Sequence, residues 1–184
     1  MMPPPTPVPR VNNTAWRLPF AAPKVASAPM ARLIGLKGWS IERAAELLER
    51  HGVENFSINA GGDIAMRGEP RPGDAWRVGI RHPDHAESSA AVVHGAGRFA
   101  VATSATYERG AHIIDPRVGV PTVGARAATV VGPDAAIADA LATAIMVDGR
   151  DSVLWLGDPA FANYSFWAVD RYGDGAWSYQ NPEG

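Results

Sequence analysis

Asp139 and Thr143 are the first residues of this sequence whose types and spacing suggest chemistry. They lie four positions apart in the otherwise apolar run IADALATAIMVDG, residues 137–149. If this run is a helix, both oxygen-bearing side chains lie on one face, one turn apart. Mg2+ prefers oxygen ligands, and an Asp and a Thr one turn apart could supply two of them. The alternative is that Thr143 donates back to the Asp139 carbonyl, with Asp139 at the solvent edge and no metal bound.

A second group of candidate residues lies in GRFAVATSATYERGAHIIDPRVGVP, residues 97–121. A strand here would end at Thr103 and Ser104, and His112 would follow in a loop. Functional side chains are often displayed on loops beside a sheet. His112 could act as a general base near neutral pH without a large shift of its pKa. The alternative is a loop stabilised by Asx and hydroxyl turns, with His112 idle on the surface.

Two glycine-containing segments could approach a phosphate or a flat ring. NAGGD, residues 59–63, places the pair Gly61 and Gly62 directly before Asp63. Paired glycines allow close backbone approach, but they also simply make a tight hairpin turn. Lys37 precedes a predicted helix, whose N-terminal N–H groups favour anions. A surface lysine at this place is also common without any ligand.

The elements that must position these residues follow from periodicity and turn signals. A helix is expected over Ser40–His51, with Ser40 as its N-cap and Gly52 as its stop. Its predicted apolar stripe consists of Ile41, Ala44, Ala45, Leu47 and Leu48. A second helix contains Asp139 and Thr143, with Pro133 in its first position and Asp134 in its first turn.

Strands are expected between and after the two helices. They are predicted over residues 56–59, 64–66, 76–83, 90–93, 98–107 and 127–132, with two or three more within residues 152–180. The pair Gly61 and Gly62 makes the first two a hairpin. This order of elements predicts an α+β fold with a layered antiparallel or mixed sheet and packed helices, and it argues against a parallel doubly wound sheet.

Composition limits the function classes. The chain has 184 residues, of which 46% are hydrophobic, enough for the core of one domain. A net charge of -2 gives no reason to expect nucleic acid or an anionic membrane as partner. The absence of cysteine excludes disulfides and thiolate metal sites. No apolar run approaches the roughly 20 residues of a transmembrane helix, and no secretory signal is present as written. We therefore predict a cytoplasmic location.

The chain is expected to have two parts. Residues 1–30 are rich in proline and alanine, show no helical or strand periodicity, and read as a poorly ordered leader. Residues 31–184 form the predicted domain. The sequence does not fix an oligomeric state, and a homo-oligomer is compatible with it.

Several ordered segments of the chain resemble the ApbE family, the FAD:protein FMN transferases. They are KGWSIERAAELLERHGVENFSINAGGDIAMRG, VATSATYERGAHIIDPRVGVP and ADALATAIMV. The family pattern is approximately D-L-G-x-x-A-K-G-Y-x-x-D, N-x-G-G-D, T-S-G-x-Y-E-R, H-I-I-D-P-x-T-G and A-D-A-L-S-T-A. The matching motifs occur in the family's order over about residues 33–150. The resemblance implies a layered, T-fold-like α+β domain.

The resemblance also implies the residues of the reaction. Asp139 and Thr143, with the main-chain carbonyl near Ile34, would bind the Mg2+ that neutralises the FAD pyrophosphate. His112 would be the base for a threonine hydroxyl on an acceptor flavoprotein, which takes FMN in phosphoester linkage and displaces AMP. Asp139 would thus count among the catalytic residues together with His112. FAD would be contacted or framed by Lys37, Gly61, Gly62, Asp63, Thr103, Ser104, His112 and Ile113.

The chain departs from the family pattern at several positions. Ala31, Arg32 and Leu33 replace D-L-G, and Ala105 and Val118 replace a glycine and a threonine. Family members also carry a long segment before this region, which supplies part of the sheet and of the isoalloxazine pocket. We therefore expect an N-terminally truncated family domain, completed by another chain or left incomplete. Two alternatives to the transferase follow: a catalytically incomplete FAD-binding remnant, and a structural α+β domain without activity.

Overall fold

A six-stranded antiparallel sheet is the centre of the computed structural model, which describes residues 36–83, 87, 89–106, 113–173 and 175–180. Its strand order is β1-β2-β5-β8-β9-β10, and every neighbouring pair is antiparallel. The bounds are β1 Phe56–Ala60, β2 Asp63–Arg67, β5 Phe99–Ala105, β8 Ala125–Gly132, β9 Ser165–Asp170 and β10 Ala176–Tyr179. The predicted α+β class is confirmed.

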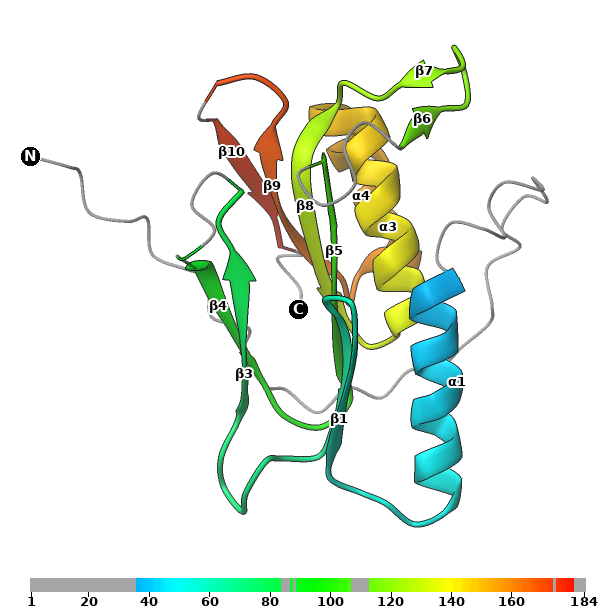
Figure 1. The fold of residues 1–184 in the computed structure, drawn as a ribbon, viewed down its shortest axis with the longest axis vertical. Coiled ribbons are helices and arrows are strands. Elements are labelled where there is room, and N and C mark those ends of the chain that lie inside the picture. The colour runs from blue at the N-terminus through cyan, green and yellow to red at the C-terminus, as the bar shows by residue number, and fades with distance from the viewer. Residues whose placement is uncertain (1–35, 84–86, 88, 107–112, 174, 181–184) are drawn as a thin grey trace, which may run out of the picture.

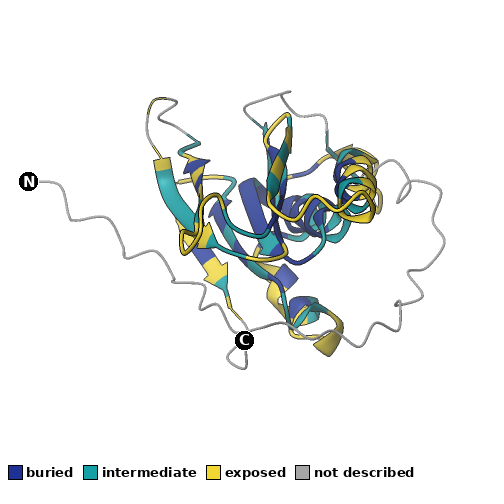
Figure 2. Cartoon of the chain, turned by 90° about the horizontal axis from the view of Figure 1, so that it is seen from below, coloured by how far each residue is buried: buried dark blue, intermediate teal, exposed yellow. Residues whose placement is uncertain are grey.

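Helices α1 (Leu36–Arg50) and α3 (Ala135–Asp148) pack on one face of this sheet (Figure 1). The antiparallel ribbon of β3 (Trp76–Arg81) and β4 (Ser89–Gly95) lies on the opposite side. Successive side chains of β5 point to opposite faces of the sheet. Ala100 and Ala102 belong to the buried clusters under the helices, and Phe99 and Val101 belong to the cluster under the ribbon. Buried residues accordingly run through the middle of the layers (Figure 2).

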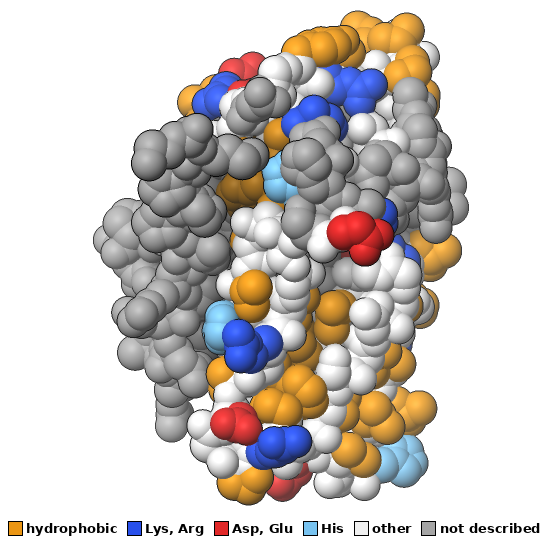
Figure 3. Space-filling view, turned by 60° about the vertical axis from the view of Figure 1, so that its left-hand side comes forward, with side chains coloured by type: hydrophobic (Ala, Val, Ile, Leu, Met, Phe, Trp, Pro, Cys, Tyr) orange, Lys and Arg blue, Asp and Glu red, His pale blue; other side chains and the backbone are white. Residues whose placement is uncertain are grey.

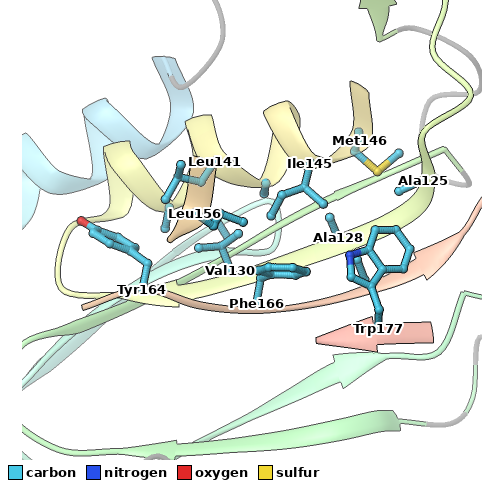
Figure 4. Close-up of a cluster of buried hydrophobic side chains, with 14 residues drawn as sticks. Ala125, Ala128, Val130, Leu141, Ile145, Met146, Leu156, Tyr164, Phe166 and Trp177 are labelled. Carbon is cyan, nitrogen blue, oxygen red and sulfur yellow. The ribbon is translucent and has the colours of Figure 1, made fainter. Parts of the chain in front are cut away.

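The largest buried cluster lies between α3 and the C-terminal half of the sheet. Leu141 and Ile145 of α3 point toward Val130 of β8 and Phe166 of β9 (Figure 4). Trp177 of β10 lies at the far end of the same cluster. Burial of large apolar side chains stabilises by about 1.5–3 kcal/mol each. This packing fixes α3, the helix that carries Asp139, against the sheet.

The N-terminus of α3 differs from its prediction by one position. Asp134 is the N-cap rather than a first-turn residue, and its carboxylate accepts the N–H groups of Ala136 and Ile137. Pro133 consequently precedes the cap instead of occupying the first helical position. The capping carboxylate gains more from two free N–H groups than from the helix dipole alone, which explains the shift.

The beginning and the buried face of α1 also differ from the prediction. The helix begins at Leu36, so Ser40 is internal and its hydroxyl donates to the Lys37 carbonyl at 2.7 Å. Ile41 and Ala45 are buried as predicted, but Leu47 is 48% exposed. Glu42 is fully buried instead. Ion pairs make this burial tolerable, and an apolar-stripe rule has no means of anticipating them. The predicted stop is confirmed, since Gly52 follows the helix with a positive φ of 78°.

The segment after α3 is helical where a strand was one of the expected possibilities. The 3-10 turn η2 (Gly149–Ser152), the short helix α4 (Val153–Leu156) and the turn η3 (Pro159–Phe161) precede β9. A short apolar run such as VLWL does not distinguish a strand from a helix by periodicity. The remaining two strands predicted for this region are confirmed as β9 and β10.

The surface shows no single-signed charge patch on the face seen in Figure 3, where acidic and basic side chains lie scattered among uncharged ones. No helix within the described residues is long and apolar enough to span a bilayer. The predicted leader, residues 1–30, lies outside the described residues.

Candidate functional site

Four segments that are distant in sequence converge where α1 begins. They are the first turn of α1, the turn between β1 and β2, the end of β5, and the middle of α3, and hydrogen bonds or ion pairs link each to a neighbour. Most of the predicted site residues lie on these segments. Ile34 and His112 lie outside the described residues, so their predicted roles stay predictions.

Asp139 joins α3 to the beginning of α1. Its Oδ2 accepts the Gly38 N–H at 2.9 Å, and the residue is only 9% exposed. This N–H is one of the first-turn donors that have no partner within their own helix. Asp139 therefore caps α1 from another helix, and the alternative that placed it at the solvent edge is wrong. A carboxylate has lone pairs for further partners beside this bond.

Thr143 lies one turn beyond Asp139 on α3, and its hydroxyl forms a hydrogen bond of 3.0 Å with the Ser104 hydroxyl. This bond joins α3 to β5. The alternative prediction had the Thr143 hydroxyl bonding back to its own helix, whereas the bond found within the described chain leads to the sheet. Asp139, Thr143 and Ser104 thus supply three oxygen-bearing side chains near the N-terminal half of α3.

Asp63 and Lys37 form a second pair beside Asp139. The Lys37 Nζ lies 2.9 Å from Asp63 Oδ2, with Asp63 1% and Lys37 36% exposed. Asp63 Oδ1 accepts the Thr103 N–H at 3.2 Å. Burial raises the pKa of Asp63 above its ordinary range, the Asp139 carboxylate adds to this rise, and the Lys37 ammonium and the Thr103 N–H oppose it.

The turn between β1 and β2 presents backbone to this pair. Gly61 and Gly62 both have positive φ, and Gly62 donates its N–H to the Asn59 side chain at 3.1 Å. A Cβ at Gly62 would meet no atom within 4 Å, so the space above this turn is open. The Lys37 Nζ also lies 3.4 Å from the Gly61 carbonyl. The predicted hairpin is confirmed, and its turn lies beside the lysine.

Thr103 and Ser104 point to opposite faces of the sheet. Ser104 faces α3, whereas the Thr103 hydroxyl bonds the Thr129 hydroxyl at 2.9 Å on the other face. Among the described residues, Thr103 contacts the candidate site through its N–H, which Asp63 accepts. Two neighbouring residues of a strand cannot both direct their side chains at one site, and the sequence pattern alone did not separate them.

Ile113 packs against the main core cluster, so its predicted contact with FAD stays a prediction. Its carbonyl accepts the Thr122 N–H at 2.9 Å, which closes the ribbon of β6 (Ile114–Asp115) and β7 (Val120–Pro121). The Thr122 hydroxyl donates to the Met146 carbonyl at 2.6 Å. This ribbon is therefore attached to the C-terminal end of α3.

Arg117 strengthens that attachment, and no sequence pattern indicated it. Its guanidinium pairs with Asp115 at 2.8 Å and with Asp148 of α3 at 2.9 Å. The arginine lowers the pKa of Asp115 below its usual range. Because Asp148 also accepts the Trp155 indole N–H at 2.9 Å, one carboxylate links α3, α4 and the ribbon.

The chemistry of these donors fits a hard divalent cation. The described residues contain no group of three or more His, Cys, Asp or Glu side chains that could hold a metal. A magnesium site here would therefore combine one carboxylate with hydroxyl and main-chain oxygens, a donor set that Mg2+ accepts alongside water or phosphate. Within the described residues, the two acidic side chains Asp63 and Asp139 lie near the one ammonium group of Lys37, a charge balance that a bound cation would offset.

Comparison with known proteins identifies one family. The model of the ApbE family matches residues 35–161. The FAD:protein FMN transferase of Vibrio cholerae is 35% identical over 125 residues, which are 62% of this chain and 37% of that protein. The FAD:protein FMN transferase of Haemophilus influenzae is 32% identical over 128 residues, 64% of this chain and 37% of that protein.

Solved structures show the same relation. The flavin transferase ApbE from Vibrio cholerae superposes with a TM-score of 0.63 at 29% identity, covering 79% of this chain and 48% of that one. The ApbE protein from Thermotoga maritima superposes with a TM-score of 0.66 at 27% identity, covering 80% and 49%. The chain thus spans less than half the length of these relatives.

Proposed function

Because the chain belongs to the ApbE family, we propose that it carries the metal-binding and phosphate-binding part of a flavin transferase. In this reaction FMN moves from FAD to a threonine hydroxyl of an acceptor flavoprotein, with Mg2+ as cofactor and AMP as the second product. The observation that carries the proposal is the convergence of Lys37, the Gly61–Gly62 turn, Ser104, and Asp139 with Thr143 at one place.

Asp139 and Thr143 are proposed to hold Mg2+, together with the carbonyl near Ile34. When bound, Mg2+ would neutralise charge on the pyrophosphate of FAD and on its leaving group. Asp139 is suited to this role because the Gly38 N–H fixes its carboxylate without neutralising it. Ser104 orients the Thr143 hydroxyl through their 3.0 Å hydrogen bond.

Lys37 is proposed to bind the FAD phosphates. Its ammonium is partly exposed and lies over the open glycine turn, where an anionic group could replace Asp63 as its partner. Of the pair Thr103 and Ser104, we place only the Ser104 side chain beside the phosphates. Thr103 supports the site by holding Asp63 through its N–H, and Ile113 is proposed to border the FAD site.

His112 is proposed as the general base. It would take the proton of the acceptor threonine while that oxygen forms a bond to the FMN phosphorus. The bond between this phosphorus and the bridging pyrophosphate oxygen then breaks, and AMP leaves with the bridging oxygen. Phosphoryl transfer depends mainly on positioning and charge neutralisation, which the described residues could supply.

Two substitutions at one position test the proposal. The chain is incubated with FAD, Mg2+ and an acceptor protein, and flavin fluorescence on the denatured acceptor reports transfer. Asp139→Asn keeps an oxygen for the Gly38 N–H but removes the charge, so we expect transfer to fall by at least about 100-fold. The free energy of unfolding should change by less than about 0.5 kcal/mol. Asp139→Ala should lose both activity and about 1 kcal/mol of stability.

The control for this assay is a full-length relative under the same conditions. Transfer by the relative but none by the unmodified chain would contradict the transferase proposal. FAD binding that strengthens with Mg2+ but produces no transfer would instead support the second candidate, an FAD-binding protein without turnover. That candidate is motivated by Ala31, Arg32 and Leu33, which stand where the family pattern has D-L-G with its acidic residue. The cytoplasmic location and homo-oligomeric assembly stay predictions.

A further inference from the structure

Glu42 is the most deeply buried charged group of the described chain that the proposed reaction does not use. It is fully buried on α1, and its Oε1 accepts Arg67 Nη2 at 2.6 Å and also Arg98 Nη2. Its Oε2 accepts the N–H of Ala135, the first residue of α3, at 3.0 Å. One carboxylate therefore joins α1, β2, the residue before β5, and α3.

This bond has a counterpart one helical turn away. Gly38 and Glu42 lie four residues apart on α1, and Ala135 and Asp139 lie four residues apart on α3. Glu42 accepts the first free N–H of α3, while Asp139 accepts a first-turn N–H of α1. Each helix thus caps the other, and we call these two bonds the reciprocal clasp.

The two helices approach each other closely at the reciprocal clasp. A Cβ on Gly38 would lie 2.3 Å from the Ala135 carbonyl oxygen and 2.7 Å from Asp139 Cβ. The two helices are therefore in backbone contact at this point, and no side chain between them can adjust to a change of spacing. If the Glu42 bond lengthens, the Gly38 bond to Asp139 must change with it.

We infer that Glu42 is a positioning residue that fixes the Asp139 carboxylate by holding α3 at its contact distance from α1. The inference deepens the proposed function, because the group that is positioned is the proposed ligand of Mg2+. Groups that orient metal ligands without touching the metal typically influence metal affinity by about 10–100-fold.

Glu42→Gln tests the inference with little change of shape. The amide of the Glu42→Gln variant would have one acceptor oxygen, which can accept from the arginines or from the Ala135 N–H but not from both. Its NH2 group would then face the other set of N–H donors. Glu49→Gln is the matched control. Glu49 pairs with Arg67 at 2.9 Å and Arg98 at 3.1 Å, as Glu42 pairs with both, but its bonds within the described chain reach only these arginines and not α3.

Two measurements are made on each variant of the full chain. The first is hydrogen exchange of the Gly38 amide by NMR, without metal or FAD and corrected for global stability. We expect exchange about tenfold faster in Glu42→Gln than in Glu49→Gln. The second is the Mg2+ concentration that gives half of the Mg2+-dependent FAD binding, which should rise about tenfold in Glu42→Gln alone.

Equal Gly38 exchange in the two variants would overturn the inference. Faster Gly38 exchange in Glu42→Gln with the same Mg2+ dependence as Glu49→Gln would overturn it too, because Glu42 would then hold the helices without positioning the Mg2+ ligand. If Mg2+ does not affect FAD binding by the unmodified chain, the proposed function fails, and Gly38 exchange alone decides the role of Glu42. If Glu42→Gln does not fold, Glu42→Asp replaces it with the same readouts. It keeps the charge but is too short to reach both Arg67 and Ala135, so faster Gly38 exchange is again expected.

Discussion

Two clusters of charged side chains lie along α1, and they differ in charge balance. In the first, Glu42 and Glu49 face Arg67 and Arg98, so two negative charges meet two positive ones. Arg67 is only 3% exposed and also donates to its neighbour's carbonyl at 3.0 Å. The buried pair Glu42 and Arg67 thus has balanced charge and bonded donors, as a structural role requires.

In the second cluster, Asp63 pairs with the Lys37 ammonium and also interacts with the Asp139 carboxylate, and Lys37 is the one cation that pairs with Asp63 within the described residues. The two carboxylates are close enough for Asp139 to raise the pKa of Asp63. A net negative charge in a buried region is costly unless a cation from solution can bind there. The comparison assigns a structural role to the balanced cluster, and it is consistent with the proposal that the unbalanced cluster takes a ligand.

The largest expected effect is on the balanced cluster. Arg67→Met leaves Glu42 buried with only the partly exposed Arg98 as its ion-pair partner, so the free energy of unfolding should fall by about 3 kcal/mol or more. Lys37→Met in the other cluster should cost less, because the Lys37 ammonium is partly exposed and because Asp63, whose pKa is already raised, can bind a proton instead of staying an unpaired carboxylate. Urea denaturation of both variants measures the difference. Equal losses would remove the distinction between the clusters.

A smaller effect is expected from the hydroxyl groups of the unbalanced cluster. Thr143→Val removes a proposed ligand oxygen and the bond to Ser104, so the Mg2+ concentration for half-maximal FAD binding should rise at least tenfold, by the rough scale of such sites. The variant should also lose about 1 kcal/mol of stability.

Thr129→Val is the control for that experiment. It removes the same kind of hydroxyl–hydroxyl bond, at 2.9 Å to Thr103, on the opposite face of the sheet. Its stability should also fall by about 1 kcal/mol, while its Mg2+ dependence stays that of the unmodified chain. A similar rise of the Mg2+ requirement in both variants would show that Thr143 acts through stability and not as a ligand.

Local rules predicted most elements of this fold but not the contacts between them. The period-two alternation of β5 and the Gly61–Gly62 turn give the strands, and the apolar period of α3 gives the helix. Glu42 shows where such rules stop. Its residue type predicts a surface position. It is buried because it pairs with Arg67 and Arg98, which are 25 and 56 residues away in the sequence.

The candidate site, too, was predictable in its residues but not in the contacts between its elements. The spacing of Asp139 and Thr143 predicted their common face, and the resemblance to a family predicted which segments would meet. Neither could predict that Gly38 donates to Asp139 or that Ser104, and not Thr103, faces α3, because both depend on helix spacing and strand register. A signal was available for the first of these contacts, since a glycine in the first turn of a helix permits close approach of a second helix.

The smallest expected effect concerns the titration of Asp63. Burial raises its pKa above the ordinary value of 3.8, so the folded chain binds this proton more tightly than the unfolded chain does. Its contribution to stability is therefore fully present below the unfolded pKa and is lost as the pH rises through the folded pKa. Asp63→Asn removes this titrating group. In urea denaturation across the acidic range, the free energy of unfolding of the variant should therefore fall less steeply with rising pH than that of the unmodified chain.

Asp115 provides a comparison of opposite sign. Arg117 lowers the pKa of Asp115, so its contribution is present above the unfolded pKa and is lost as the pH falls through the folded pKa. The free energy of unfolding of Asp115→Asn should therefore fall less than that of the unmodified chain as the pH is lowered. That of Asp63→Asn should fall less as the pH is raised toward neutral. If both variants change the pH profile in the same direction, Asp63 is stabilised as a carboxylate, and the cluster around it does not have the excess of negative charge that would favour a cation.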